Sequence, residues 1–368
     1  MNELKKAREE INEIDCQMAA LFARRMRAVE SVAAYKQLHG LPILDPTREE
    51  EIITRGSERV ADPTLRAYYV EYLRDVMKIS RRYQHRLSEG MRVAFSGVSG
   101  AFAAIAAEKI FPDAAHISYP NFRAAYDAVV ASECDVAVLP IENSTAGEVG
   151  QVMDMMFSGS LYVNGVFDLS INHCLMALPG ADETSIREVI SHPQALAQCA
   201  PFLRDRGYRQ TQYENTALAA QEVAKSGDLS LAAIASEETA GLFGLKILAR
   251  NINSSGVNTT RFAVLSRVRE ESAREEGKHS ILMFTVRNEA GALARVIGII
   301  GRYGYNMRCL RSRPMKELSW QYYFYVEAEG DLGSENGRRM MAELAPSCDR
   351  LRMLGSFRYP AVLGKEEG

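Results

Sequence analysis

The sequence of 368 residues lacks any apolar run approaching the ~18 residues that a membrane-spanning helix needs, and its densest stretch, Val296 to Ile300, is short. Its six cysteines (16, 134, 174, 199, 309 and 348) are scattered without a CxxC pair, which argues against a disulfide framework and a zinc site. Residues 1–11 are charged and lack the apolar core of a signal peptide. We therefore expect a cytoplasmic protein with reduced thiols and no contact with a membrane.

An excess of positive charge is also missing. The chain has 44 basic and 47 acidic residues and a net charge of −3, so nothing indicates a nucleic-acid surface. Hydrophobic residues make up 47% and charged residues 25%, which is close to the globular average and excludes a disordered or fibrous chain. The length predicts about two or three domains.

The pattern along the chain changes twice. Residues 1 to about 87 are helical in period throughout, and from Met91 short β-branched runs alternate with helical stretches, which is typical of an α/β domain. The charged run from Glu270 to Lys278 is a linker candidate, followed by strand, helix, strand, strand, helix and strand. We predict three domains: all-α over 1–88, α/β over 91–268 and a small α+β unit over 279–358.

The first predicted helix, about Leu4 to Leu38, carries cations on an apolar stripe. At about 100° per residue, Arg25 and Lys36 fall on the same line as the stripe, and Arg8 lies about 100° away. A buried cation without a partner costs several kcal/mol, so the two need carboxylates from neighbouring helices, an escape to the rim, or an anionic ligand. The stripe consists of Ile11, Ile14, Met18, Leu21, Val29 and Val32.

Two further helices add polar groups. The second begins at Asp45-Pro46-Thr47, a good start signal, and by themselves Arg48 and Glu49 would be solvated first-turn residues. In the third, about Thr64 to Leu87, Ser80 and Gln84 continue an apolar line at i, i+4 spacing, which hydrogen bonds between helices would also explain. Together, the three helices offer cations and neutral donors that suit a small dianion.

This set resembles the all-helical chorismate mutase domain of bacterial bifunctional aromatic-biosynthesis enzymes, over residues 4 to about 87. The resemblance implies that Lys36 and Gln84 donate to the ether oxygen of the substrate and that Glu49 contacts its hydroxyl. It further implies an interlocked dimer in which Arg8 enters the other protomer's site. All eight family positions carry the expected residue type: Arg8, Arg25, Lys36, Asp45, Arg48, Glu49, Ser80 and Gln84.

The chemistry suits these residue types. The rearrangement of chorismate to prephenate moves no proton and needs no nucleophile, so its site needs shape and fixed positive charge at the breaking bond. The resemblance implies that Arg25 and Arg48 bind the substrate carboxylates.

The α/β segment has four local signatures. The glycine loop at 97–100 (GVSG) is neither GxGxxG nor a P-loop, so a dinucleotide or ATP site is not expected, and a bare turn is favoured. PIENSTAG at 140–147 follows a predicted strand, where α/β proteins bind ligands, although a helix cap would also explain it. SHPQ at 191–194 opens a helix with Gln198 and Cys199, with Ser191 as an alternative cap. In NTTRF, at 258–262, Thr260 could simply cap a turn.

PIEN, SHPQ with the downstream Gln-Cys, and TRF together resemble the prephenate dehydratase domain, over about 91–268. The resemblance implies two α/β lobes with the site in their cleft, similar to type-II periplasmic binding proteins. It implies that Thr260 is the acid for the departing hydroxyl and that Arg261 binds the substrate carboxylates. Ala103 and Val166 depart from the family's pattern and concern secondary substrate contacts. The implied site is Asn143, Ser191, Gln198, Thr260 and Arg261.

The C-terminal segment resembles an ACT domain, βαββαβ, over about 279–357. We expect a helix to open at Gly291-Ala292-Leu293 after a strand from Ser280 to Val286, SRP at 312–314 to follow the next strand, and another strand from Trp320 to Val326. In dehydratases this domain binds phenylalanine between paired copies, whereas a dimerisation unit without effector is the alternative. Arg311 stands where the family has glutamate, which inverts a charge beside the effector site. The implied site is Gly291, Ala292, Leu293, Arg311, Ser312, Arg313 and Pro314.

The leading hypothesis is a bifunctional enzyme that takes chorismate to prephenate and prephenate to phenylpyruvate, without metal or organic cofactor. We expect a homodimer or homotetramer that phenylalanine inhibits. The alternative is a non-enzymatic sensor built from a binding-protein fold and an ACT domain, which should carry a DNA-binding helix-turn-helix or a signal peptide. A mutase fused to prephenate dehydrogenase would need GxGxxG after a strand. None of these features is found in the sequence.

Overall fold

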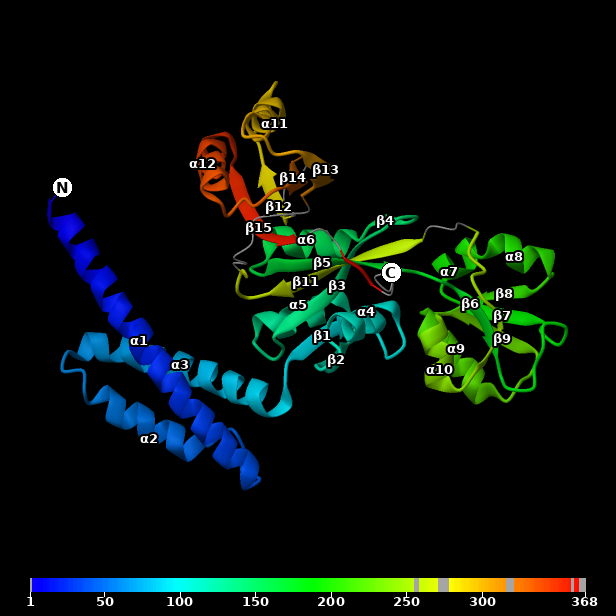
Figure 1. The fold of residues 1–368 in the computed structure, drawn as a ribbon, viewed down its shortest axis with the longest axis horizontal. Helices are drawn as coiled ribbons and strands as arrows, with labels where there is room; N and C mark the ends of the chain where they lie inside the picture. Colours follow the sequence, from blue (N-terminus) through cyan, green and yellow to red (C-terminus); the bar gives the residue numbers. More distant parts are fainter. Residues whose placement is uncertain (1, 255–257, 271–277, 316–320, 359–360, 364–368) are drawn as a thin grey trace. The chain divides into compact units, whose positions relative to one another are not determined.

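The computed structural model describes residues 2–254, 258–270, 278–315, 321–358 and 361–363. The chain divides into two compact units, residues 1–92 and 93–368. The first is a set of three helices, and the second contains two α/β lobes and a smaller sheet with two helices (Figure 1). The predicted combination of an all-α, an α/β and an α+β fold is therefore confirmed.

In the first unit, α1 (Asn2–Leu38) and α2 (Pro46–Ser57) both pack on α3 (Pro63–Glu89). The start signal of α2 acts as predicted, since Asp45 is its N-cap and proline follows, and α3 begins in the same way at Asp62. A side-chain oxygen of Asp45 accepts from the backbone N–H of Arg48 at 3.0 Å, and one of Asp62 accepts from that of Thr64 at 2.8 Å.

The apolar stripe of α1 is largely exposed in the single chain. Ile11, Ile14 and Leu21 keep 55%, 48% and 61% of their surface, and of the described side chains of α1 only Val29 and Ala33 are buried. The prediction of a buried stripe is wrong for one chain, because α1 has 37 residues and α3, its packing partner, has only 27. Among the described residues of the helical unit, part of α1 therefore has an apolar face that the other two helices leave exposed.

The first lobe of the second unit is a mixed sheet in the order β16-β5-β11-β3-β1-β2, with β4 paired to β3. Its helices are α4 (Phe102–Ile110), α5 (Phe122–Val130) and α6 (Gly150–Ser158). β1 and β3 are parallel, and β11 runs antiparallel between β3 and β5. The strands are β1 (Arg92–Ser96), β2 (Ala115–Tyr119), β3 (Val136–Asn143), β4 (Gly147–Glu148), β5 (Tyr162–Ser170), β11 (Thr259–Ser266) and β16 (Ala361–Leu363).

The second lobe has the strand order β10-β6-β9-β7-β8. Its strands are β6 (Cys174–Ala177), β7 (Glu188–Ser191), β8 (Arg209–Gln212), β9 (Leu231–Ala235) and β10 (Lys246–Ala249). Its helices are α7 (Pro193–Gln198), α8 (Ala200–Asp205), α9 (Thr216–Ser226) and α10 (Glu237–Phe243). The chain enters this lobe after β5 and returns before β11, which confirms the predicted two-lobed arrangement.

Three signature motifs lie inside strands, although we expected them at strand ends. PIEN belongs to β3 and TRF to β11, because Thr260 pairs with Asn143 and Arg261 with Glu142, and a register shift beside Phe262 accommodates Pro140. SRP belongs to β13 and pairs with 322–324 of β14. Ser191 ends β7, and the N-cap of α7 is His192, whose Nδ1 accepts from the backbone N–H of Gln194 at 3.2 Å.

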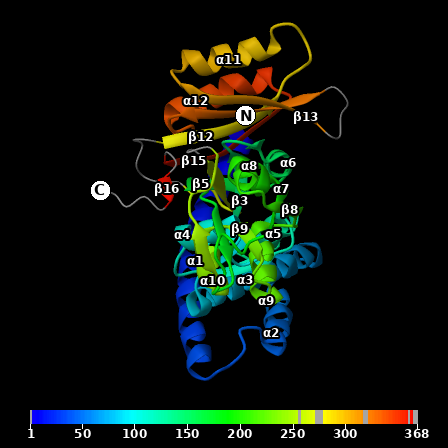
Figure 2. The ribbon, with the colours of Figure 1, turned by 90° about the vertical axis from the view of Figure 1, so that its right-hand side faces the viewer.

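The C-terminal elements form the predicted βαββαβ unit, with strand order β13-β14-β12-β15. The strands are β12 (Lys278–Thr285), β13 (Met307–Pro314), β14 (Tyr322–Glu329) and β15 (Arg350–Arg358). The helices α11 (Ala292–Arg302) and α12 (Glu335–Leu344) cover one face of the sheet (Figure 2). Gly291 opens α11 as predicted, in the left-handed region with φ 80°. Trp320 and residues 271–277 of the predicted linker lie outside the described residues.

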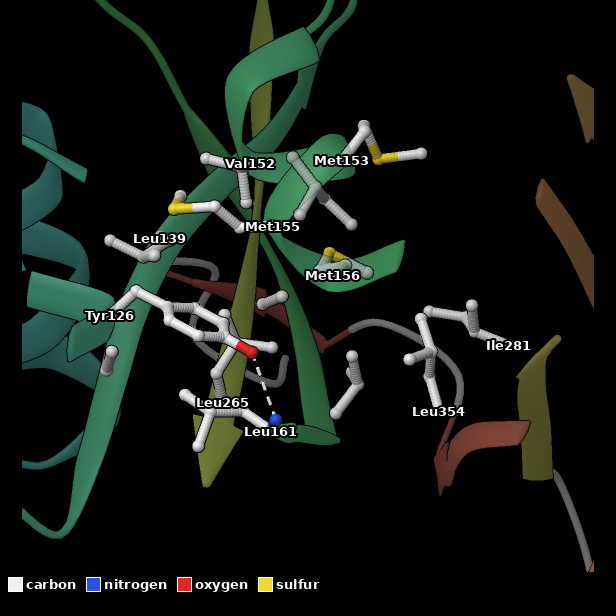
Figure 3. Close-up of a cluster of buried hydrophobic side chains, with 14 of the residues drawn as sticks. Tyr126, Leu139, Val152, Met153, Met155, Met156, Leu161, Leu265, Ile281 and Leu354 are labelled. Atoms are coloured by element: carbon white, nitrogen blue, oxygen red, sulfur yellow. Dashed lines mark hydrogen bonds between the residues drawn. The ribbon is translucent and has the colours of Figure 1, made fainter. Parts of the chain in front are cut away.

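The small sheet is covered on both faces. Leu282 and Phe284 of β12 pack against α11 and α12, whereas Ile281 and Met283 join the core of the first lobe. Figure 3 shows this core, in which Met153 and Met156 of α6 lie between the lobe's sheet and β12, with Leu354 of β15. In the same core the Tyr126 hydroxyl accepts from the backbone N–H of Leu161 at 3.0 Å. β12 is buried along its length because apolar side chains from two layers meet its two faces.

At one position β15 approaches β5 so closely that only glycine fits. A Cβ on Gly355 would overlap the carbonyl oxygen of Val163. We expect Gly355→Ala to lower the free energy of unfolding of the second unit by about 1–3 kcal/mol, because the two layers must separate. Thermal unfolding measures this. The matched control is Gly241→Ala in α10, where a Cβ meets open space. Equal melting temperatures for the two variants would contradict the close contact.

Two active sites and a charged contact with the C-terminal sheet

In the helical unit, Arg25, Ser80 and Gln84 form one cluster. The Arg25 guanidinium donates to Ser80 Oγ, which donates to the carbonyl of Val76 at 2.7 Å. Burial lowers the pKa of Arg25, and no carboxylate among the described residues pairs with it. Gln84 is buried, and its Oε1 has no hydrogen-bond partner. A desolvated cation beside an unsatisfied amide is what a small anionic ligand would complete.

The other predicted positions of this site make local contacts. Lys36 Nζ donates to the carbonyl of Ile43 at 2.6 Å, Arg48 pairs with Glu51 at 2.8 Å, and Glu49 pairs with Arg81. Asp45 caps α2, and Arg8 is exposed, as are its described neighbours on α1. One chain therefore brings together only three of the eight positions.

In the second unit, Asn143 is the centre of a second cluster. It is the last residue of β3 and is buried. Its Oδ1 accepts from the backbone N–H groups of Thr145 and Ala146 at 3.0 and 2.9 Å. Its Nδ2 donates to Thr260 Oγ1 at 2.9 Å and to Asn258 Oδ1 at 3.0 Å. Because backbone donors cannot accept, they determine which end of the Asn143 amide faces Thr260.

Gln198, at the end of α7 in the second lobe, joins this cluster. Its Nε2 donates to Thr145 Oγ1 at 2.6 Å, and its Oε1 accepts from Asn258 Nδ2 at 2.9 Å. His173 Nε2 lies 2.9 Å from the same Oε1. The predicted residues Asn143, Gln198 and Thr260 therefore meet, and their hydrogen bonds connect the two lobes.

Sequence reasoning missed three members of this cluster. Thr145 and Asn258 stood inside the quoted motifs without an assigned role, whereas His173 had no motif signal. His173 is 2% exposed, burial lowers its pKa, and its ring packs edge-on against Phe102 with 5.7 Å between centroids. Only the fold, which places the segment after β5 against α7, makes His173 a candidate.

A cavity of about 560 Å³ adjoins the cluster. Phe102 of the first lobe and Ser236 of the second both line it, as do Leu169, the register partner of Thr260, and Asn172, the neighbour of His173. Its volume lies in the range of small-molecule sites, which is about 300–1,000 Å³. The cavity therefore lies between the lobes and is lined by neighbours of the cluster, while the side chains of the cluster itself are not part of its lining.

Two predicted residues of this site lie elsewhere. The Ser191 hydroxyl is fully buried and donates to the carbonyl of Ile234 at 2.7 Å. Arg261 follows Thr260 in an extended strand, so its side chain leaves from the opposite face. There it pairs with Asp168 at 3.0 Å and with Glu327 of β14 at 3.3 Å. Burial alone would lower the pKa of Arg261, but these carboxylates raise it.

The predicted effector residues of β13 contact the first lobe. Arg311 pairs with Glu142, and Arg313 pairs with Glu148 and, at 3.3 Å, with Asp154. Ser312 lies between them with its side chain on the other face, Pro314 ends the strand, and residues 291–293 open α11. The arginine at 311 therefore supplies the countercharge of the glutamate in PIEN.

No helix within the described ranges is long and apolar enough to cross a membrane, and no group of three or more His, Cys, Asp or Glu in those ranges is placed to hold a metal ion.

A cationic cluster on helices, an amide and hydroxyl cluster between two α/β lobes, and a βαββαβ unit indicate a multidomain enzyme with two candidate active sites. Comparison with known proteins agrees: the chorismate mutase type II model matches residues 7–85, and the prephenate dehydratase model matches residues 93–270. The chain is 32% identical, over 373 residues and the whole of both chains, to the bifunctional chorismate mutase/prephenate dehydratase of Aquifex aeolicus (strain VF5).

Two solved structures resemble the second unit. The prephenate dehydratase of Arthrobacter aurescens in complex with L-Phe is 26% identical with a TM-score of 0.68, over 74% of this chain and 93% of that one. GqqA, described as a novel type of quorum quenching acylase, is 30% identical with a TM-score of 0.67, over 73% of this chain and 98% of that one. The chain belongs to the family of bifunctional chorismate mutase/prephenate dehydratases. It catalyses both reactions in phenylalanine biosynthesis.

Proposed function

We propose that the dehydratase reaction takes place at the Asn143–Thr260 cluster, with Thr260 as the proton donor. The observation that carries this proposal is that Thr260 Oγ1 accepts from Asn143, while its own proton is given to no group among the described residues. In the reaction the ring C–OH bond breaks and the hydroxyl leaves as water with the donated proton. The C–CO₂ bond breaks, CO₂ leaves, and its electron pair enters the ring.

Aromatisation drives this step, so modest acid assistance from a hydroxyl suffices, and solvent restores the threonine proton. The Asn143 amide donates a hydrogen bond to the oxygen of Thr260 and so fixes the position of this oxygen. Through its hydrogen bonds with Thr145 and Asn258, Gln198 connects this pair to the second lobe.

The geometry favours this chemistry over acyl transfer, the activity named for GqqA. An acylase needs a nucleophile activated by a base. The partner of Thr260 is an amide N–H, which cannot take its proton, and His173 Nε2 faces Gln198. Burial raises the pKa of the Cys199 thiol to about 12, so it is not a thiolate at neutral pH.

We expect Thr260→Val, which keeps the volume and removes the hydroxyl, to lower dehydratase kcat by about two to three decades, as the loss of a transition-state donor does. Thr260→Ser should retain most of the rate. Phenylpyruvate formation from supplied prephenate measures both, and mutase activity of the same preparations controls for folding. A near-normal rate in the valine variant would exclude the acid role.

For the mutase site, we propose that Arg25, Ser80 and Gln84 of one chain are completed by Arg8 of a second chain. The support is the exposed stripe of α1, which carries Ile11, Ile14 and Leu21 beside the exposed Arg8. Covering such a face in a symmetric dimer contributes about 25 cal/mol per Å² of apolar surface. We propose that the assembled site also contains the other family positions, which are Lys36, Asp45, Arg48 and Glu49.

For the whole chain, we propose three functional parts: residues 1–88, 91–268 and 279–358.

Subunit mixing tests this assembly. Arg8→Ala and Gln84→Leu should each lack mutase activity, and after subunit exchange part of it should return, because the hybrid dimer holds one intact site. Gln37→Leu, the same substitution at an exposed position of α1, serves as the control and should stay active. If proven hybrids stay inactive, each site is built from a single chain.

For regulation, we propose that phenylalanine binds the C-terminal units and lowers dehydratase activity through the contact of β13 with the first lobe. The support is the pair of Arg311 with Glu142, since Glu142 precedes Asn143 in β3. An effector acts only if it prefers one state, and typical couplings are about 1–3 kcal/mol.

We expect L-phenylalanine to bind wild type and to inhibit it. Arg311→Gln should still bind, with weaker inhibition, because the link to β3 is lost. Calorimetry and dehydratase assays measure the two quantities, and Arg302→Gln, an exposed residue of α11 paired with Glu343, is the control. Equal inhibition of all three proteins would contradict a role of the Arg311–Glu142 pair.

A further inference from the structure

Asn143 and three neighbouring side chains form a closed ring of hydrogen bonds that runs in one direction. Asn143 Nδ2 donates to Asn258 Oδ1, and Asn258 Nδ2 donates to Gln198 Oε1. Gln198 Nε2 donates to Thr145 Oγ1, and the Thr145 hydroxyl donates back to Asn143 Oδ1 at 2.7 Å. The direction follows from the backbone N–H groups of Thr145 and Ala146, which require an acceptor at the Oδ1 of Asn143.

The ring requires one orientation of the Gln198 amide. If that amide were reversed, its N–H₂ group would face that of Asn258, and Asn258 would have to reverse as well. The N–H₂ group of Asn258 would then face that of Asn143, which donates to Thr260. Two N–H₂ groups that face each other in a buried site raise the free energy of the folded state. A reversal at Gln198 would therefore displace Asn143 from Thr260.

Two residues select that orientation at the two ends of the Gln198 amide. At the Nε2 end, Thr145 Oγ1 has a free lone pair, because its proton is given to Asn143. At the Oε1 end, His173 must donate through Nε2. Burial lowers the pKa of His173, which keeps the ring neutral, and a neutral ring with a proton on Nε2 has none on Nδ1. Nδ1 of His173 is indeed buried without a hydrogen-bond partner.

We infer that Thr145 and His173 are positioning residues of the dehydratase: they hold the Gln198 amide in the orientation that keeps Asn143 donating to Thr260, so that the proton of Thr260 is directed to the substrate. This inference depends on the proposed role of Thr260. It also explains why the residues come from both lobes. Gln198 reaches Thr145 only when α7 lies against the loop after β3, so the same contacts that join the lobes order the acid.

The experiment uses two pairs of variants in the full-length chain, with prephenate supplied. Thr145→Val removes the hydroxyl at similar volume, and Thr145→Ser restores it. His173→Phe removes the donor and keeps a ring against Phe102, and His173→Gln returns an N–H near the former Nε2. We expect the valine and phenylalanine variants to lose about a hundredfold in kcat, as misplacement of a catalytic group does, with little change in KM. The serine and glutamine variants should recover most of the rate.

Mutase activity of each preparation reports on folding of the chain, and circular dichroism reports on the second unit. Thr145 is exposed, so its variants remain informative if those at the buried His173 do not fold. Wild-type kcat in Thr145→Val, or losses in both pairs that the conservative variants do not recover, would overturn the inference. If Thr260→Val is inactive in either case, the proposed acid stands and only the positioning role fails; if Thr260→Val is active, the proposed function itself fails.

Discussion

The antiparallel pairing of β3 with β11 is the constraint on which the second unit depends. It places Asn143 opposite Thr260 and, one residue away, Glu142 opposite Arg261. Because successive side chains of a strand point to opposite faces, the first pair lies at the hydrogen-bond ring between the lobes, where Asn143 is a member and Thr260 accepts from it, and the second pair faces the C-terminal sheet. There Arg311 and Glu327 meet Glu142 and Arg261. The proposed dehydratase chemistry and its proposed regulation thus lie on the two faces of the same pair of strands.

The two reactions need different kinds of side chains. The mutase reaction needs charge in a fixed place and no proton transfer, and in our proposal helices supply this through Arg25, Ser80 and Gln84. The dehydratase reaction needs one proton delivered in one direction, and a ring of amides and a hydroxyl can define a direction because each member has a donor end and an acceptor end. A carboxylate in the ring would accept hydrogen bonds at both of its oxygens, so the ring would have no defined direction.

Local signals predicted much of this molecule. Asp45 caps α2 at the expected turn, the C-terminal elements follow the expected βαββαβ order, and Asn143, Gln198 and Thr260, which the motifs singled out, lie in one cluster. One prediction failed because we assigned all residues of the TRF motif to one site. Thr260 and Arg261 are neighbours in β11, so their side chains point to opposite faces of the sheet. His173 could not be predicted because its significance depends on a contact with α7 that links distant parts of the chain. The exposure of the apolar stripe of α1 was not predicted, because the pattern of one sequence shows an apolar face but not what covers it.

The most direct test of this account is the proton position on His173, measured by nitrogen NMR of protein with labelled histidine and assigned by the loss of its signal in His173→Phe. The account predicts a neutral ring with the proton on Nε2 at neutral pH, and it predicts that the ring stays neutral at pH values where an ordinary histidine takes up a proton, since burial lowers the pKa of this group. A proton on Nδ1 in the neutral ring, with Nε2 bare, would contradict the account, because His173 could then not donate to Gln198 and the direction of the ring would be lost.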